Sequence, residues 1–134
     1  QSFDQDLKIS YLGHKNAIKN YLTPIENLKL LFSGDDLNIA FEWLNKFGLS
    51  HVQDELTASL SFGQQKKLAL IRVLAQSSDL LILDEPFVGL DQATADQLNS
   101  FLAQKISQDV GLILTSHITP MIDCAVLDLG AKNA

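Results

Sequence analysis

Two continuous apolar runs constrain the fold of this 134-residue chain most strongly. They are "DLLILDEP", Asp79–Pro86, and "GLILTSH", Gly111–His117, and a segment with helical character, about 92–107, lies between them. A run of this length without alternating polar residues is typical of a strand that is covered on both faces, as in parallel sheets. A third run, "CAVLDLG", Cys124–Gly130, has the same character. Strands that alternate with helices form βαβ units, so the sequence predicts an α/β fold with a parallel sheet.

The N-terminal half carries signals for a strand and a short helix. "LKISYLG", Leu7–Gly13, alternates apolar and polar residues and ends in glycine, which predicts a strand. Thr23 is suited to cap a helix, Pro24 to occupy its first position and Glu26 its third. A helix is therefore expected to begin here and to end near Gly34.

Two further helices are expected before the first apolar run. Over Asp35–Leu49 the apolar residues form one stripe at helical spacing, namely Leu37, Ala40, Phe41, Leu44 and Phe47. Gly48 should end this helix, and Trp43, which lies off the centre of the stripe, should pack against a neighbouring helix. The next helix is expected over about 61–76.

Composition and charge exclude several classes of protein. The chain is 46% hydrophobic and 19% charged, which indicates a globular rather than a disordered protein. A net charge of −6 argues against a nucleic-acid partner, which would require clustered Lys and Arg. No apolar run approaches the roughly 18 residues of a membrane span, and no signal-peptide pattern is present. Cys124 is the single cysteine, which favours a reducing compartment and a buried apolar role.

The chain is expected to be organised in three parts. These are a strand and loop over 1–19, a helical subdomain over 20–60 and an α/β part over 61–134. Because the sequence begins at Gln1 rather than at Met, we expect it to be a piece of a longer protein.

Two acidic residues follow the first apolar run directly. In a parallel sheet, ligands gather beyond the carboxyl ends of the strands, where Asp84 and Glu85 would emerge. One carboxylate can hold a hydrated Mg²⁺ while the other orients and activates a water, as phosphoryl transfer to water requires. A polar strand end before a turn at Pro86 is the alternative interpretation.

The second apolar run ends in Ser116 and His117. If the two strands are neighbours, His117 lies at the same edge as Glu85 and can contact a terminal phosphate oxygen. A histidine after a strand is more often structural, and its pairing with the two acids favours the functional interpretation. Downstream of the acids, Asp91 of "VGLD" is suited to cap the next helix, and capping alone accounts for it locally.

The segment "LSFGQ" places a helix start after small and polar residues. Ser61 is a good cap, and the backbone N–H groups of Phe62, Gly63 and Gln64 begin the helix. Unpaired N–H groups and the positive end of the helix dipole form an anion site. Every helix has such an end, so this signal is weak by itself.

Together these motifs resemble the second half of an ATP-binding-cassette (ABC) ATPase domain, which is an α/β fold of the P-loop NTPase type. "LSFGQ" resembles the family's signature, "LLILDE" its Walker B strand, "GLD" its D-loop, and His117 its switch histidine. The resemblance implies ATP and Mg²⁺ as ligands. It implies that Glu85 is the general base, that Asp84 holds Mg²⁺ through water, that His117 contacts the γ-phosphate and that Asp91 communicates across a dimer.

The resemblance also explains why a phosphate-facing helix start lacks a partner loop. In the family, two domains pack head to tail, and the signature of one domain contacts the nucleotide of the other. Ser61, Phe62, Gly63 and Gln64 would therefore contact phosphate in a second ATPase subunit of a homodimer.

Upstream, "YLGHKNAIKNYLTPIENLKLL" resembles the Q-loop segment of the family's heme-exporter group, which serves cytochrome c biogenesis. His14 falls where most members carry the Q-loop glutamine, which implies a link to integral membrane permease subunits. The location implied is peripheral, at the cytoplasmic face of the bacterial inner membrane.

Two features depart from the family pattern. Phe62 replaces a small residue of the signature, and no G-x-x-x-x-G-K-[ST] pattern occurs, so the Walker A half is missing. The chain is therefore expected to be the C-terminal part of a longer ATPase and to be inactive alone. The alternatives are a non-hydrolysing docking module with the cassette shape, and a soluble ABC ATPase that serves no transporter.

Overall fold

The computed structural model describes residues 7–13 and 17–115. Within these ranges, three strands, four helices and two short 3-10 turns follow one another in the order β1 (Ile9–Leu12), α1 (Pro24–Leu31), α2 (Gly34–Lys46), η2 (Ser50–Val52), η3 (Thr57–Ser59), α3 (Phe62–Leu74), β2 (Leu80–Asp84), α4 (Gln92–Ser107) and β3 (Gly111–Thr115). The predicted strand 124–130 lies outside the described residues, so that prediction is untested. No helix in the described ranges is long and apolar enough to cross a membrane.

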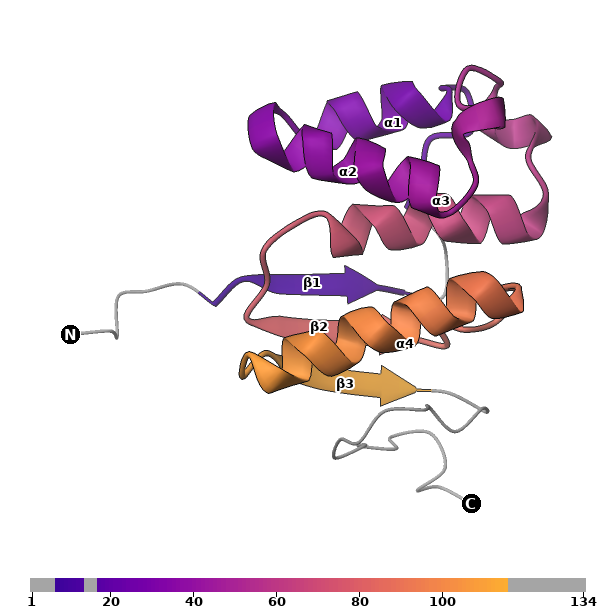
Figure 1. Ribbon diagram of the computed structural model, residues 1–134. Helices are drawn as coiled ribbons and strands as arrows, with labels where there is room; N and C mark the ends of the chain where they lie inside the picture. Colours follow the sequence, from indigo (N-terminus) through magenta and orange to yellow (C-terminus); the bar gives the residue numbers. More distant parts are fainter. Residues whose placement is uncertain (1–6, 14–16, 116–134) are drawn as a thin grey trace.

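The three strands form one parallel sheet in the order β1-β2-β3, and the arrowheads of the outer strands β1 and β3 point the same way in Figure 1. Leu83 is aligned with Leu12 of β1 on one side and with Leu114 of β3 on the other. The helix α4 joins β2 to β3. The predicted α/β class with a parallel sheet and βαβ connection is therefore confirmed.

The two faces of the sheet differ in how well they are covered. Leu12, Leu81, Leu83 and Leu114 share one face and are at most 2% exposed. Both connections move across the sheet in the same direction, so right-handed crossovers place α3 and α4 on this same face. The apolar core of the chain therefore lies between these helices and the sheet.

The opposite face of the sheet is open among the described residues. Ile9 is 53% exposed and Tyr11 is 55% exposed, and on β2 the aligned Leu80 and Ile82 are only partly buried. The cover on both faces that the apolar runs predict is therefore present on one face of the described residues only. The strand residues are apolar on both faces of the sheet, but α3 and α4 cover only one of these faces.

The predicted start of α1 and the predicted stop of α2 at Gly48 agree with the structure, because these signals are local. The predicted end of α1 near Gly34 is wrong, since α1 ends at Leu31 and Gly34 is the first residue of α2. The Thr23 hydroxyl accepts a hydrogen bond from the Glu26 N–H at 3.1 Å, and Glu26 Oε1 accepts one from the Thr23 N–H at 2.9 Å. At the end of α2, Gly48 has a φ of +73°, which a residue without a Cβ adopts without strain. Both expected signals are confirmed.

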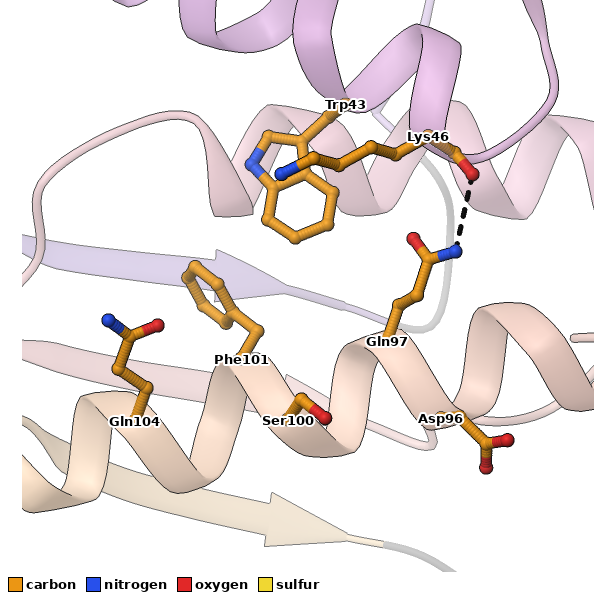
Figure 2. A pocket seen from close by; sticks show the side chains of 7 residues that line it. All are labelled: Trp43, Lys46, Asp96, Gln97, Ser100, Phe101 and Gln104. Carbon is orange, nitrogen blue, oxygen red and sulfur yellow. Dashed lines mark hydrogen bonds between the residues drawn. The ribbon is translucent and has the colours of Figure 1, made fainter.

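The helices α2 and α4 meet through aromatic side chains, which Figure 2 shows lining a pocket between them. The ring of Trp43 lies 5.7 Å from that of Phe101 in an edge-to-face arrangement. Beside them, Gln97 Nε2 donates to the backbone oxygen of Lys46 at 3.3 Å. The prediction that Trp43 packs against a neighbouring helix is confirmed, and the neighbour is α4.

The helix α3 packs against both parts into which the sequence was divided. It contacts α1 and α2 on one side and β1 on the other. The division of the chain at residues 60 and 61 therefore stays a prediction, because α3 belongs to the packing of both parts.

Candidate functional site

The two acidic residues lie at the carboxyl edge of the sheet, as expected. β2 ends at Asp84, which is aligned with Thr115 at the end of β3. The Thr115 hydroxyl donates a hydrogen bond to Asp84 Oδ1, and the Glu85 N–H bonds to the Thr115 carbonyl oxygen at 2.8 Å and to its hydroxyl at 3.2 Å. Thr115 therefore holds the carboxylate of Asp84 and the backbone of Glu85.

The backbone at Glu85 adopts a left-handed conformation with a φ of +48°. A residue with a Cβ rarely occupies this region, and doing so costs about 1–3 kcal/mol unless neighbouring contacts hold it. Its N–H is held by Thr115, as described above. Its carbonyl oxygen accepts bonds from Lys66 Nζ at 2.9 Å and from the Val88 N–H at 3.3 Å. The main chain is thus fixed on both sides of Glu85.

Lys66 and Thr115 are contacts of the site that sequence reasoning missed. Lys66 lies in the second turn of α3 and is only 6% exposed. Burial lowers the pKa of its ammonium group, while the negative charges of Asp84 and Glu85 act in the opposite direction. Lys66 and Lys67 are adjacent in the sequence, but nothing local shows which of the two lysines contacts Glu85.

The start of α3 has the capping geometry predicted for it. The Ser61 hydroxyl accepts from the Gln64 N–H at 3.1 Å, and Gln64 Oε1 accepts from the Ser61 N–H at 2.9 Å. The cap does not use the N–H groups of Phe62 and Gly63, which also begin the helix. This helix start has the features of an anion site, and its role in binding stays a prediction.

The signature segment, Leu60–Gln64, packs against the loop that follows β2. A Cβ placed on Gly63 would lie 2.8 Å from the carbonyl oxygen of Gly89, and one placed on Gly89 would lie 2.5 Å from Cε2 of Phe62. The first distance is to a backbone atom, so close approach requires glycine at position 63, while Gly89 has a φ of +83°, which favours glycine whatever the space around it. Phe62, the residue that departs from the family pattern, lies against Gly89 and is still 61% exposed.

Asp91 caps α4, as the sequence predicted. Its Oδ1 accepts from the Thr94 N–H at 2.8 Å, and its Oδ2 pairs with Lys67 Nζ at 3.1 Å. The bonds from Thr94, with a smaller contribution from Lys67, lower the pKa of Asp91 to about 2. The predicted communication role of Asp91 is not tested by these contacts.

Two predicted site residues, His14 and His117, lie outside the described residues, so their predicted roles are untested. The prediction for His117 required the strands that precede Glu85 and His117 to be neighbours, and β2 and β3 are hydrogen-bonded neighbours. Within residues 7–13 and 17–115, no group of three or more His, Cys, Asp and Glu side chains is placed to hold a metal ion.

A parallel sheet with two acids at its carboxyl edge and a signature-like helix start beside the next loop is the arrangement expected for the second half of an ABC ATPase domain. A family profile described as "ABC transporter" matches residues 3–88 of this chain. The chain belongs to the ABC transporter family.

Among curated relatives, several are named "Cytochrome c biogenesis ATP-binding export protein CcmA". The protein from Idiomarina loihiensis is 38% identical over 113 residues, which cover 82% of this chain and 51% of the relative. The protein from Escherichia coli (strain K12) is 37% identical over 116 residues, which cover 87% and 55%. The chain thus spans about half the length of the curated relatives it matches.

Solved structures agree on the fold. One described as the ATP-binding subunit of an ABC transporter superposes with a TM-score of 0.74 and 24% identity, covering 83% of this chain and 49% of its own. A dimeric ATP-binding cassette, MJ0796, described in a post-hydrolysis state with ADP and Pi, gives a TM-score of 0.69, with coverage of 83% and 53%. The predicted fold class, an ABC ATPase fragment of the α/β P-loop type, is confirmed.

Proposed function

We propose that this chain is the C-terminal part of the ATP-hydrolysing subunit of an ABC transporter in cytochrome c biogenesis, of the heme-export type. The observation that carries the proposal is the pair Asp84 and Glu85, held by Thr115 at the carboxyl edge of a parallel sheet. The names and identities of the curated relatives support the transporter class. The Walker A loop is not present in this sequence, so the chain alone should not hydrolyse ATP.

The residues present fit a magnesium ion. Mg²⁺ binds oxygen ligands, keeps several of its waters and needs only one or two carboxylates beside the substrate phosphates. Asp84 supplies such a carboxylate, of which Thr115 engages one oxygen. We assign Asp84 to hold Mg²⁺ through water, and the ion when bound neutralises charge that develops on the transferred phosphate.

Glu85 is the proposed general base. Its carboxylate takes the proton of the attacking water, and its backbone is held in place by bonds on both sides. His117 is proposed to contact the γ-phosphate. Asp91 is proposed to communicate between subunits, and His14 to link the site to the membrane partner.

The signature segment is proposed to act in trans. The N–H groups at the start of α3 would contact the phosphates held by a second ATPase subunit, with Ser61, Phe62, Gly63 and Gln64 in the contact. ATP binding then closes a homodimer and hydrolysis reopens it. The proposed partners are this second subunit and integral membrane permease subunits, at the cytoplasmic face of the bacterial inner membrane. No nucleic acid is involved.

Replacing the proposed base tests this function in a full-length cassette that contains this chain. Glu85→Gln keeps the size of the side chain and removes the base, so ATP turnover should fall by about 100-fold or more while ATP still closes the dimer. Steady-state phosphate release and sedimentation with Mg-ATP measure the two effects. Glu42→Gln, an exposed position on α2, is the matched control and should leave turnover unchanged. Near-normal turnover in Glu85→Gln would contradict the proposal.

A further inference from the structure

Adjacent lysines on α3 have different surroundings. The side chain of Lys67 is 15% exposed; its Nζ donates to the Phe47 carbonyl oxygen at 3.1 Å and pairs with the exposed carboxylate of Asp91 at 3.1 Å. Lys66 is 6% exposed and points its ammonium group at the main chain, where Nζ donates to the Glu85 carbonyl oxygen at 2.9 Å. Of these two neighbouring lysines, only Lys66 is bonded to the backbone of Glu85.

A buried ammonium group is unfavourable unless it is hydrogen-bonded. An apolar side chain would fill the same volume without that penalty. The bond from Lys66 is charge-assisted and lies in a partly buried place, which makes it stronger than an ordinary bond between neutral groups. What the ammonium achieves here is a firm hold on one peptide group, the one that follows Glu85.

That peptide group is one of two that determine where the Glu85 side chain starts. Thr115 holds the N–H on the preceding side, and Lys66 holds the carbonyl oxygen on the following side. Between them Glu85 keeps a φ of +48°, which a non-glycine residue leaves readily when it is not restrained. The Val88 N–H also donates to this oxygen, at 3.3 Å, but the bond from Lys66 is shorter and charge-assisted. Losing it would weaken the restraint on the strained backbone and allow the carboxylate to move from its place.

We propose that Lys66 is a positioning residue for Glu85, acting through the main chain and not through contact with substrate. This inference rests on the proposed function, because it requires Glu85 to be the general base. Small displacements of a reacting group are costly, since a shift of about 1 Å can lower a rate by about 100-fold. A positioning role therefore predicts a loss in kcat with little change in nucleotide affinity.

The test uses the full-length cassette that contains this chain. Lys66→Met keeps most of the volume and removes the donor, and kcat should fall by about 10- to 100-fold with KM for ATP changed by less than about 3-fold. Lys66→Arg keeps a charged donor, so its kcat should lie clearly above that of Lys66→Met. ATP-dependent dimer formation should be retained in both.

The matched control is Arg72→Met on the same helix. Arg72 is partly buried and donates from Nη2 to the Tyr11 carbonyl oxygen at 3.1 Å. The substitution therefore also removes a bond from a cationic side chain to a backbone carbonyl, but on β1 and not beside Glu85. Its thermal stability should fall as in Lys66→Met, and its kcat should stay near that of the unsubstituted protein. If Lys66→Met does not fold, Lys66→Leu, which also removes the donor, is judged by the same criteria.

The outcomes separate the two claims. If Glu85→Gln is inactive while Lys66→Met keeps its kcat, or loses only as much as Arg72→Met, the positioning role is overturned and the proposed function stands. If Glu85→Gln itself turns over normally, the proposed function has failed regardless of Lys66. A low kcat with unchanged KM in Lys66→Met, recovered by arginine, supports the inference.

Discussion

Asp91 combines a cap and an ion pair in one carboxylate. It accepts from the Thr94 N–H and pairs with Lys67, and both interactions favour its charged form. They lower its pKa from the ordinary 3.8 to about 2. A carboxyl with a lowered pKa contributes stability that is present above its ordinary pKa and is lost as the pH falls through its folded value. The window for Asp91 is therefore from about pH 4 down to about pH 2.

We predict that Asp91→Asn lowers the Tm near pH 6 and that its difference from the unsubstituted protein shrinks towards zero by about pH 2. Asparagine still caps a helix, so the difference reports the charge and not the loss of the cap. Thermal unfolding followed by circular dichroism across the pH range measures it. Asp54→Asn, an exposed position between α2 and α3, is the control. A Tm difference that is constant between pH 6 and pH 2 would show that the charge of Asp91 is not the cause.

At the scale of elements, two helices begin with the same hydrogen-bonding pattern. Thr23 and Glu26 form it at α1, and Ser61 and Gln64 form it at α3. The two starts therefore offer a comparison between a cap that is only structural and one that is also proposed to contact phosphate.

We predict that Thr23→Ala and Ser61→Ala each lower the free energy of unfolding by about 1 kcal/mol, because each removes the cap. Only Ser61→Ala should weaken ATP-driven dimer formation in a full-length cassette. Urea unfolding and sedimentation with Mg-ATP measure the two quantities. Equal effects of both substitutions on dimer formation would mean that Ser61 acts only as a cap.

The elements could be predicted from sequence because their signals are local. A cap, a proline and a glycine act within a few residues, and the apolar character of Leu80–Leu83 is enough to predict a strand in a parallel sheet. The contacts of the site could not be predicted in the same way. Lys66 meets Glu85 19 residues away, and Thr115 meets Glu85 30 residues away. Such pairs depend on register and helix rotation, which no local pattern specifies.

At the scale of the whole molecule, one face of the sheet is apolar and open among the described residues. Its exposed residues, Ile9 and Tyr11, and its partly buried ones, Leu80 and Ile82, are apolar. Burying such a side chain contributes about 1.5–3 kcal/mol, so the face favours association with another surface. In a longer cassette we expect the segment that carries the Walker A loop to cover it.

We predict that the chain alone self-associates at micromolar concentration, as a dimer or a larger oligomer. The double substitution Ile9→Lys and Tyr11→Lys puts charge on the open face and should shift the chain towards monomer. Sedimentation velocity measures both states. Lys substitutions at Asp36 and Glu42, on the exposed side of α2, change charge without touching the sheet and serve as the control. A monomer with one sharp thermal transition would show that the described half closes its own core.

The central claim is that one subunit supplies Asp84 and Glu85 while its partner supplies the signature segment. Mixing two inactive full-length cassettes tests it most directly. Ser61→Arg blocks the phosphate contact of its own signature, and Glu85→Gln removes its own base. In a mixed dimer, one site combines the intact Glu85 of the first subunit with the intact signature of the second.

The account predicts that neither variant hydrolyses ATP alone and that their equimolar mixture does. Random pairing makes half of the dimers mixed, each with one complete site, so activity should recover to on the order of a quarter of the unsubstituted level. Phosphate release after mixing and equilibration is the measurement. A mixture as inactive as its two components would contradict a site shared between subunits.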